Sequence, residues 1–141
     1  MKIPDLKPVI QQEATGCGIA SAAAIAGISY SKAKQLANSL GIYADDENLW
    51  SDTKSVRRLL KALGIKVNPG ESPFKNWEAL PDCALLAIKW HREKGKPYWH
   101  WVVFVRENNN EFVLDSKKTL KSNIRTDFGR MKPKWFIKVN F

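Results

Sequence analysis

The chain contains 141 residues, of which 44% are hydrophobic and 26% are charged. These values are typical of a globular protein and exclude a largely disordered one, so we expect one domain over residues 1–141. No apolar run approaches the ~20 residues that a membrane-spanning helix needs. The first eight residues lack the hydrophobic core of a secretory signal, which predicts a cytoplasmic protein and leaves signal-independent secretion open. The 23 Lys and Arg outnumber the 14 Asp and Glu, and this net charge of +9 would attract an anionic partner.

Three segments of the first half, which spans about residues 1–67, have helical patterns. Residues 18–26 are small and apolar on nearly every side, which is typical of a short buried helix. A second helix is expected to begin near Ser29, a favourable N-cap residue, and to end at Gly41. A third is expected to begin near residue 51 or 52 and to end at Gly64. Its apolar residues recur at the spacing of one helical face: Val56, Leu59, Leu60 and Leu63.

The second half, about residues 83–141, has the pattern of a β-sheet. A loop over residues 68–82, punctuated by Pro and Gly, separates it from the helical half. The charged segment 92–96 is expected to be a solvated loop, and three asparagines at 108–110 are expected to form a turn. The expected strands are residues 65–67, 84–90, 99–105, 111–114 and 135–141. Helices followed by strands predict an α+β fold, with N-terminal helices packed on a C-terminal antiparallel sheet.

Cys17 lies directly before the small apolar helix. A thiol at a helix N-terminus feels the positive end of the helix dipole, which favours the thiolate, the nucleophilic form. Gly18 leaves space beside it for a substrate carbonyl and for backbone N–H donors. A lone cysteine is also commonly a small buried hydrophobic residue, so Cys17 alone decides nothing. The second cysteine, Cys83, has no evident role, and two cysteines are too few for a disulfide framework.

His100 and Asp115 are candidate partners of this thiol. His100 lies near the start of an expected strand, on the opposite face from Trp99 and Trp101. Asp115 ends the next strand, and pairing across the asparagine turn places it close to the level of His100 and Trp101. A carboxylate there could accept from one imidazole nitrogen and leave the other to face a thiolate. His91, at the edge of the charged segment, is the weaker candidate, and each of these residues also has an ordinary structural explanation.

The order of these residues resembles that of papain-like cysteine peptidases, in which a cysteine at a helix start precedes a strand histidine and then an acid. Residues 11–20, Gln-Gln-Glu-Ala-Thr-Gly-Cys-Gly-Ile-Ala, resemble the N-terminal motif of the bacteriocin-processing peptidases. Members of that family remove double-glycine leaders and are often fused to ABC exporters. Residues 100–103, His-Trp-Val-Val, resemble its histidine motif. The resemblance covers about residues 9–115, and Ser116 stands where the family commonly has proline.

The resemblance implies a cysteine peptidase that works through a thioester acyl-enzyme. The implied catalytic residues are Cys17, His100, Asp115 and Gln11. The Gln11 side-chain amide and the Cys17 backbone N–H are expected to form an oxyanion hole, with Gln12 as the fallback donor. Substrate contacts are expected at four residues, although core packing explains the two tryptophans equally well: Gly16, Gly18, Trp99 and Trp101.

The implied substrate is a peptide or protein, cleaved after a Gly-Gly-like pair of small residues. Neither a metal nor a cofactor is expected. Membrane segments and a nucleotide-binding motif do not follow Asp115, so we expect a stand-alone domain. Any coupling to export would then need a separate transporter or secretion partner.

Four alternatives stay open or weak at this stage. The same fold could serve as a catalytically weak peptide-binding module, and the same residues could support an amidase or an acyltransferase. Nucleic-acid binding is suggested only by the net charge, because the basic residues are spread over several segments and no recognised motif accompanies them. The spacing of the two cysteines and two histidines fits no standard zinc site.

Overall fold

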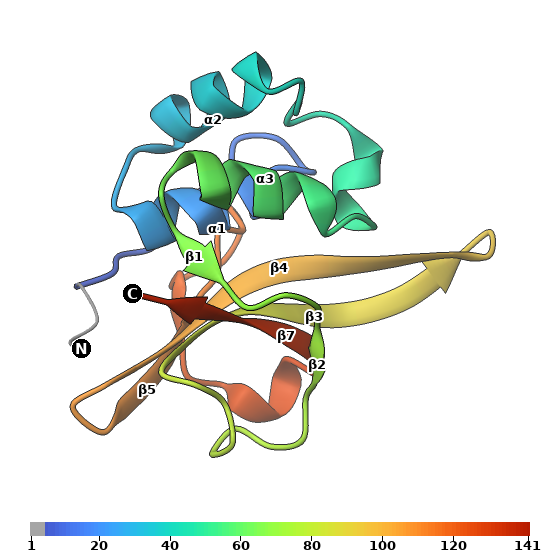
Figure 1. Ribbon diagram of the computed structural model, residues 1–141. Coiled ribbons are helices and arrows are strands. Elements are labelled where there is room, and N and C mark those ends of the chain that lie inside the picture. Colours follow the sequence, from blue (N-terminus) through green and yellow to red (C-terminus); the bar gives the residue numbers. More distant parts are fainter. Residues whose placement is uncertain (1–4) are drawn as a thin grey trace.

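The structure, a computed structural model, describes residues 5–141 and shows three helices packed on one side of an antiparallel sheet (Figure 1). In spatial order the sheet contains β1 (Lys66–Val67), β7 (Pro133–Asn140), β3 (Cys83–Glu93), β4 (Lys96–Glu107), β5 (Asn110–Leu114) and β6 (Ile124–Arg125), while β2 (Ser72–Pro73) pairs with β7. The fold class is α+β, as predicted. No helix within residues 5–141 has the length and apolarity that crossing a membrane requires.

The helices are α1 (Cys17–Ala26), α2 (Tyr30–Ser39) and α3 (Lys54–Ala62), with a short 3-10 helix, η1 (Glu47–Trp50), before α3. All three predicted helices are confirmed. The Ser29 side chain caps α2 by accepting from the Lys32 backbone N–H. α3 begins two or three residues later than expected, after Thr53 at its N-cap position, and the preceding Asp52 binds its first turn. The Asp52 carboxylate accepts from the Lys54 backbone N–H at 2.7 Å and from the Ser55 hydroxyl at 2.9 Å.

The hairpin of β3 and β4 corrects the prediction of a solvated loop over residues 92–96. β3 extends to Glu93, β4 begins at Lys96, and only Lys94 and Gly95 form the turn. Both turn residues have positive φ, 52° and 77°, as a tight two-residue hairpin turn requires. The charges of this segment hide its strands in the sequence, because the exposed outer end of a hairpin needs no apolar alternation. Two very short strands, β2 and β6, were also not predicted.

The two faces of the sheet carry separate apolar clusters. Trp99, Trp101 and Val103 of β4 pack on the helix side, with side chains of α1 and α3. Val102 and Phe104 point to the other side, which loop residues and the short helix η2 (Phe128–Arg130) cover. The alternation predicted for β4 is therefore confirmed for its apolar residues from Trp99 to Phe104.

Two irregularities shape the sheet around Trp99 to Val102 of β4. The register of β3 and β4 shifts opposite Trp99, and Lys89 of β3 adopts a φ of 55° there. A bulge of this kind bends a strand and redirects its side chains. On the other side of β4, β5 ends at Leu114, which pairs with Val103. The edge of β4 before Val103 therefore has no β5 partner, and the N-terminus of α1 lies against it.

Candidate active site

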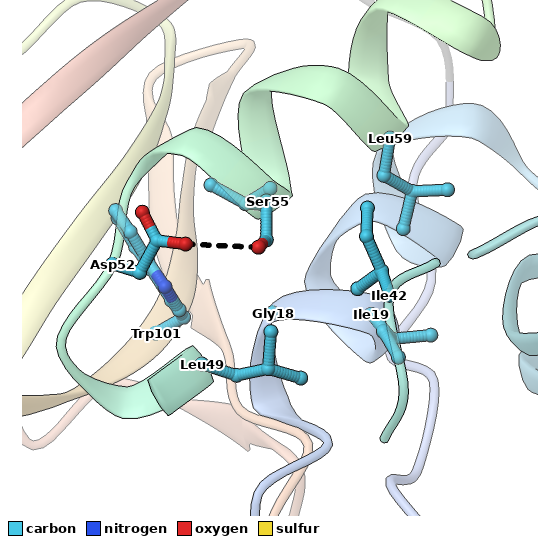
Figure 2. A pocket seen from close by; sticks show the side chains of 9 residues that line it. Gly18, Ile19, Ile42, Leu49, Asp52, Ser55, Leu59 and Trp101 are labelled. Carbon is cyan, nitrogen blue, oxygen red and sulfur yellow. Dashed lines mark hydrogen bonds between the residues drawn. The ribbon is translucent and has the colours of Figure 1, made fainter. Parts of the chain in front are cut away.

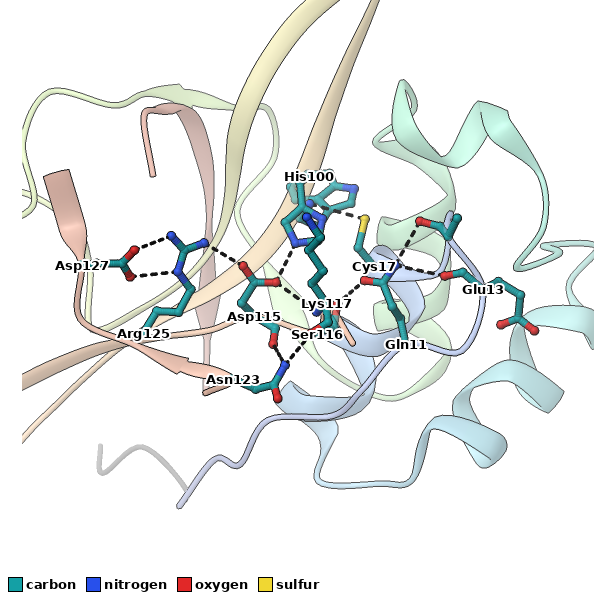
Figure 3. A network of polar contacts seen from close by, with 12 residues as sticks. Gln11, Glu13, Cys17, His100, Asp115, Ser116, Lys117, Asn123, Arg125 and Asp127 are labelled. Carbon is teal, nitrogen blue, oxygen red and sulfur yellow. Dashed lines mark hydrogen bonds and ion pairs between the residues drawn. The ribbon is translucent and has the colours of Figure 1, made fainter. Parts of the chain in front are cut away.

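Cys17 is the first residue of α1, and its thiol lies at the free edge of β4. The sulfur accepts a hydrogen bond from the Trp101 backbone N–H, with 3.5 Å between N and Sγ (Figure 3). The N-cap residue, Gly16, provides no side-chain cap, so the first N–H groups of α1 have no side-chain acceptor there. Such groups stabilise negative charge at a helix N-terminus. The Cys17 side chain is fully buried, so a substrate reaches the sulfur only if a neighbouring group moves.

His100 connects Cys17 to Asp115. Its Nε2 lies 2.7 Å from Oδ1 of Asp115, which leaves Nδ1 as the nitrogen available to the thiol (Figure 3). Burial alone would lower the pKa of His100. Interactions with the Asp115 carboxylate and the Cys17 side chain outweigh burial and raise this pKa to about 9. The imidazolium form is thus favoured at neutral pH, as a thiolate–imidazolium pair needs.

Asp115 leaves the sheet directly after β5 and is almost completely buried, with 1% exposure. The register places it next to the Val103–Leu114 pair, one or two residues from the predicted level, and its side chain still reaches His100. The Lys117 backbone N–H donates to Oδ1 at 3.1 Å. Burial would raise the pKa of Asp115, but the hydrogen bond and charge of His100, with the Lys117 and Arg125 donors, lower it to about 2.

Two residues that the sequence did not single out hold Asp115 in place. Arg125 of β6 donates from Nη1 to Oδ2 of Asp115 at 3.0 Å, and two further nitrogens of its guanidinium bind the Asp127 carboxylate. Asn123 donates from its side chain to the Asp115 backbone oxygen at 2.7 Å, and its own backbone oxygen accepts from the Asp115 N–H at 2.9 Å. Both lie in a basic, loop-like segment without periodicity, so no sequence signal distinguishes them from surface residues.

Gln11 lies beside this group, and Gln12 is exposed. The Gln11 Nε2 donates to the backbone oxygens of Glu13 and Ala14, both at 3.0 Å, so both amide hydrogens are engaged. Its Oε1 accepts from the Ser116 hydroxyl at 2.6 Å, and its backbone N–H donates to the Ser116 oxygen at 2.9 Å. Ser116, where the resembled family commonly has proline, therefore orients the Gln11 amide. To serve an oxyanion, this amide must release one of its two carbonyl partners.

The two glycines predicted to contact substrate each face an aromatic side chain. A Cβ at Gly16 would collide with the Tyr30 hydroxyl, and a Cβ at Gly18 would lie 3.3 Å from Cδ1 of Trp101. Trp101 itself is 1% exposed and packs edge to face on Trp99 and Trp135, which places it in the core. Trp99 is also largely buried, and its indole nitrogen has no hydrogen-bond partner among the described residues.

A small apolar pocket between α1 and α3 borders Gly18 and Trp101 (Figure 2). Its free interior volume is about 10 Å³, which holds at most one water molecule. Asp52 and Ser55, hydrogen-bonded to each other, form its polar side. This pocket is therefore too small for a substrate side chain.

A larger pocket lies beside His100, with a free volume of about 310 Å³. We call it the His100 pocket. Neither Cys17 nor Gly18 lines it. The residues that do are Gln11, Ala14, Trp50, Lys89, His91, Glu93, Tyr98, Trp99, His100 and Lys117.

Cys83, the second cysteine, has an environment that does not activate its thiol. It begins β3 and is buried at 2% exposure. Burial, together with the charge of Asp82, raises the pKa of its thiol to about 12, which keeps it protonated and unreactive. Within residues 5–141, no three His, Cys, Asp or Glu side chains form a group that could hold a metal ion.

Comparison with known proteins supports the fold and goes no further. The sequence matches no known protein family and no curated protein. One similar solved structure is the crystal structure of a double glycine motif protease from an AMS/PCAT transporter in complex with the leader peptide. The similarity has a TM-score of 0.60 with 17% identity, and covers 98% of this chain and 93% of that chain. The fold is that of a papain-like cysteine peptidase. At this identity the similarity shows the fold alone, so the activity and the substrate of this chain have to be inferred from its own residues.

Proposed function

We propose that this protein is a cysteine peptidase with Cys17 as nucleophile, His100 as acid–base and Asp115 as the group that orients His100. The observation that carries the proposal is the hydrogen-bonded arrangement of His100 between a fully buried carboxylate and a thiol at a helix N-terminus. Cys17, His100 and Asp115 are far apart in the sequence. Together they supply the thiol, the imidazole and the carboxylate that thiol acyl transfer uses.

The proposed reaction proceeds in two steps. The Cys17 thiolate attacks the carbonyl carbon of a peptide bond and forms a C–S bond. The C–N bond then breaks as His100 gives its proton to the leaving amine. In the second step His100 takes a proton from water, the resulting hydroxide attacks the thioester, and the C–S bond breaks to restore the thiolate. The Cys17 backbone N–H and a released Gln11 amide would stabilise the oxyanion, each by ~3 kcal/mol.

The proposed substrate is a peptide cleaved after a pair of small residues such as Gly-Gly. This preference rests on the motif over residues 11–20 and on the fold shared with a double glycine motif protease. We propose that the protein acts in the cytoplasm, with a transporter or secretion system as its partner where cleavage is coupled to export.

One observation favours a second candidate, a peptide-binding module of the same fold. The Cys17 thiol is fully buried and both hydrogens of the Gln11 amide are engaged, as expected of a site that binds without turnover. A peptidase requires this state to open when substrate enters.

Cleavage of matched peptides separates these two functions. We expect a peptide with a central Gly-Gly pair to be cut after the second glycine, whereas the same peptide with Leu-Leu is cut far more slowly. Mass spectrometry of the products identifies the cleaved bond, and binding is measured in parallel by tryptophan fluorescence. Binding of the Gly-Gly peptide without any product would reject the peptidase and support the binding module.

A further inference from the structure

The His100 pocket lies on one defined side of the bond that would be cleaved. In the proposed reaction His100 protonates the leaving amine, so the chain that follows the cleaved bond passes on the His100 side of Cys17. The pocket is lined by His100 and by neither Cys17 nor Gly18. Its volume, about 310 Å³, is sufficient for one or two side chains. A substrate would therefore place the residues after the cleaved bond in this pocket.

Two lysines give the inner end of the pocket a positive charge. Lys89 directly follows Ile88, the β3 residue that pairs with His100. Lys117 belongs to the turn that binds Asp115, because its backbone N–H donates to that carboxylate at 3.1 Å. Both backbones are thus close to the catalytic group, and Figure 3 shows the Lys117 side chain extending toward His100.

The amines of both lysines are available to a ligand. Both residues are exposed, and neither amine forms an ion pair or a side-chain hydrogen bond with another of residues 5–141. The backbone of Lys89 is also unusual, because its φ of 55° is rare for a residue other than glycine. Lys89 lies at the bulge opposite Trp99. Bulges beside active sites commonly redirect a side chain, and this one lies at the wall of the pocket.

The acidic residue of the pocket lies at its outer end. Glu93 is paired with Lys96 in the hairpin register, next to the turn, and its carboxylate is 3.4 Å from Nε2 of His91. Glu93 is therefore four residues from Lys89 along β3, and its carboxylate already has His91 as a partner. The Trp50 and Tyr98 rings, which pack edge to face, form an apolar wall between the two ends.

We propose that the His100 pocket selects substrates with an acidic side chain among the first residues after the cleaved bond. This inference rests on the proposed peptidase function, and it adds a substrate class that the small residues before the bond do not define. The two lysines would hold the carboxylate, and Trp50 and Tyr98 would pack against the aliphatic part of the substrate.

Peptides that differ only after the Gly-Gly pair test this proposal. Three peptides carry Asp, Ala or Lys at the first two positions after the cleaved bond. We expect kcat/KM to be about three- to tenfold higher for the Asp peptide than for the Lys peptide, as one or two partly screened charges would produce. The ratio should fall as salt is added.

Charge reversal identifies the groups responsible. In the double variant Lys89→Glu, Lys117→Glu the preference should change to the Lys peptide. Lys61→Glu is the matched control, because Lys61 is exposed on α3 and lies outside the pocket, so the ratio should stay as in the unaltered protein.

The possible outcomes distinguish a failure of the acidic preference from a failure of the proposed peptidase function. Equal cleavage of the three peptides would overturn the acidic preference and leave the peptidase intact. If no peptide is cleaved, the peptidase fails, and the preference is then decided by binding, measured through tryptophan fluorescence since Trp50 and Trp99 line the pocket. Equal binding of Asp and Lys peptides would reject it, whereas tighter Asp binding that charge reversal inverts would support it.

Discussion

Replacing Cys17 with serine is expected to lower the rate of peptide cleavage by roughly four to six orders of magnitude, the usual cost of removing a nucleophile that acts as a unit with its base. The hydroxyl is far less acidic than a thiol, so His100 cannot hold it as an anion. The fold should persist, because serine is slightly smaller and its oxygen can still accept from the Trp101 N–H. Product formation, measured by mass spectrometry, gives the rate, and thermal unfolding checks the fold.

The matched control for this variant is Cys83→Ala. The Cys83 thiol is buried, has its pKa raised to about 12 and lies at the start of β3 opposite Val105, five residue pairs along the hairpin from His100, so its loss should leave cleavage unchanged. A small loss of stability is expected from the cavity. Retained cleavage in Cys17→Ser would show that another group is the nucleophile.

Replacing Asp115 with asparagine is expected to reduce both cleavage and stability. An amide at this position can hold His100 in the wrong tautomer, a change that costs about 10⁴-fold in a comparable triad. It also removes the buried charge that Arg125 and His100 share, and breaking such a pair costs about 3 kcal/mol. Cleavage rates and the free energy of unfolding, measured on one preparation, test both effects.

The pH dependence of stability gives this variant a specific signature. The pKa of Asp115 is lowered to about 2 in the folded state, so its contribution is present above the unfolded value of about 4 and is lost as pH falls toward 2. The pKa of His100 is raised to about 9, so its contribution is complete below about 6.5 and is lost as pH rises through 9. In Asp115→Asn the loss of stability between pH 6.5 and 9 should be much smaller. An unchanged profile would contradict the pairing of His100 with Asp115.

Arg125→Met is the companion variant, because it removes a donor to Asp115 without touching His100. We expect a smaller loss of cleavage, about tenfold, the range for one charged hydrogen bond. Because the Asp115 charge is then less neutralised, the pKa of His100 should rise, and the alkaline limb of the pH–rate profile should move upward. A loss of rate without this movement would make Arg125 a structural residue only.

The elements that the sequence predicted best are those with strong local signals. α1 follows from a small apolar run, α2 from the Ser29 cap, and α3 from one apolar face. The hairpin end was missed, because Lys94 and Gly95 form a turn that looks like part of a longer charged loop. Its outer strands are exposed, so burial imposes no alternation on them.

The residues of the candidate site also differ in how well the sequence predicts them. Cys17 begins a helix and Asp115 directly follows a strand, and both positions can be read from the chain. His100 lies inside β4, whose aromatic and β-branched run marks it as a strand, although the strand begins four residues before His100. The hydrogen bonds of Gln11 and the contact of Arg125 with Asp115 depend on loop conformations that no periodic pattern specifies. The packing of Trp101 on Gly18 likewise depends on how α1 meets β4.

The reactivity of the two thiols tests the central claim most directly. The protein is treated with iodoacetamide at neutral pH, and the rate of alkylation at each cysteine is determined by mass spectrometry of its peptides. Activation by His100 predicts that Cys17 reacts much faster than Cys83, and faster than Cys17 in a His100→Ala variant. Slow and equal labelling of both thiols, or alkylation of Cys83 alone, would contradict a catalytic Cys17.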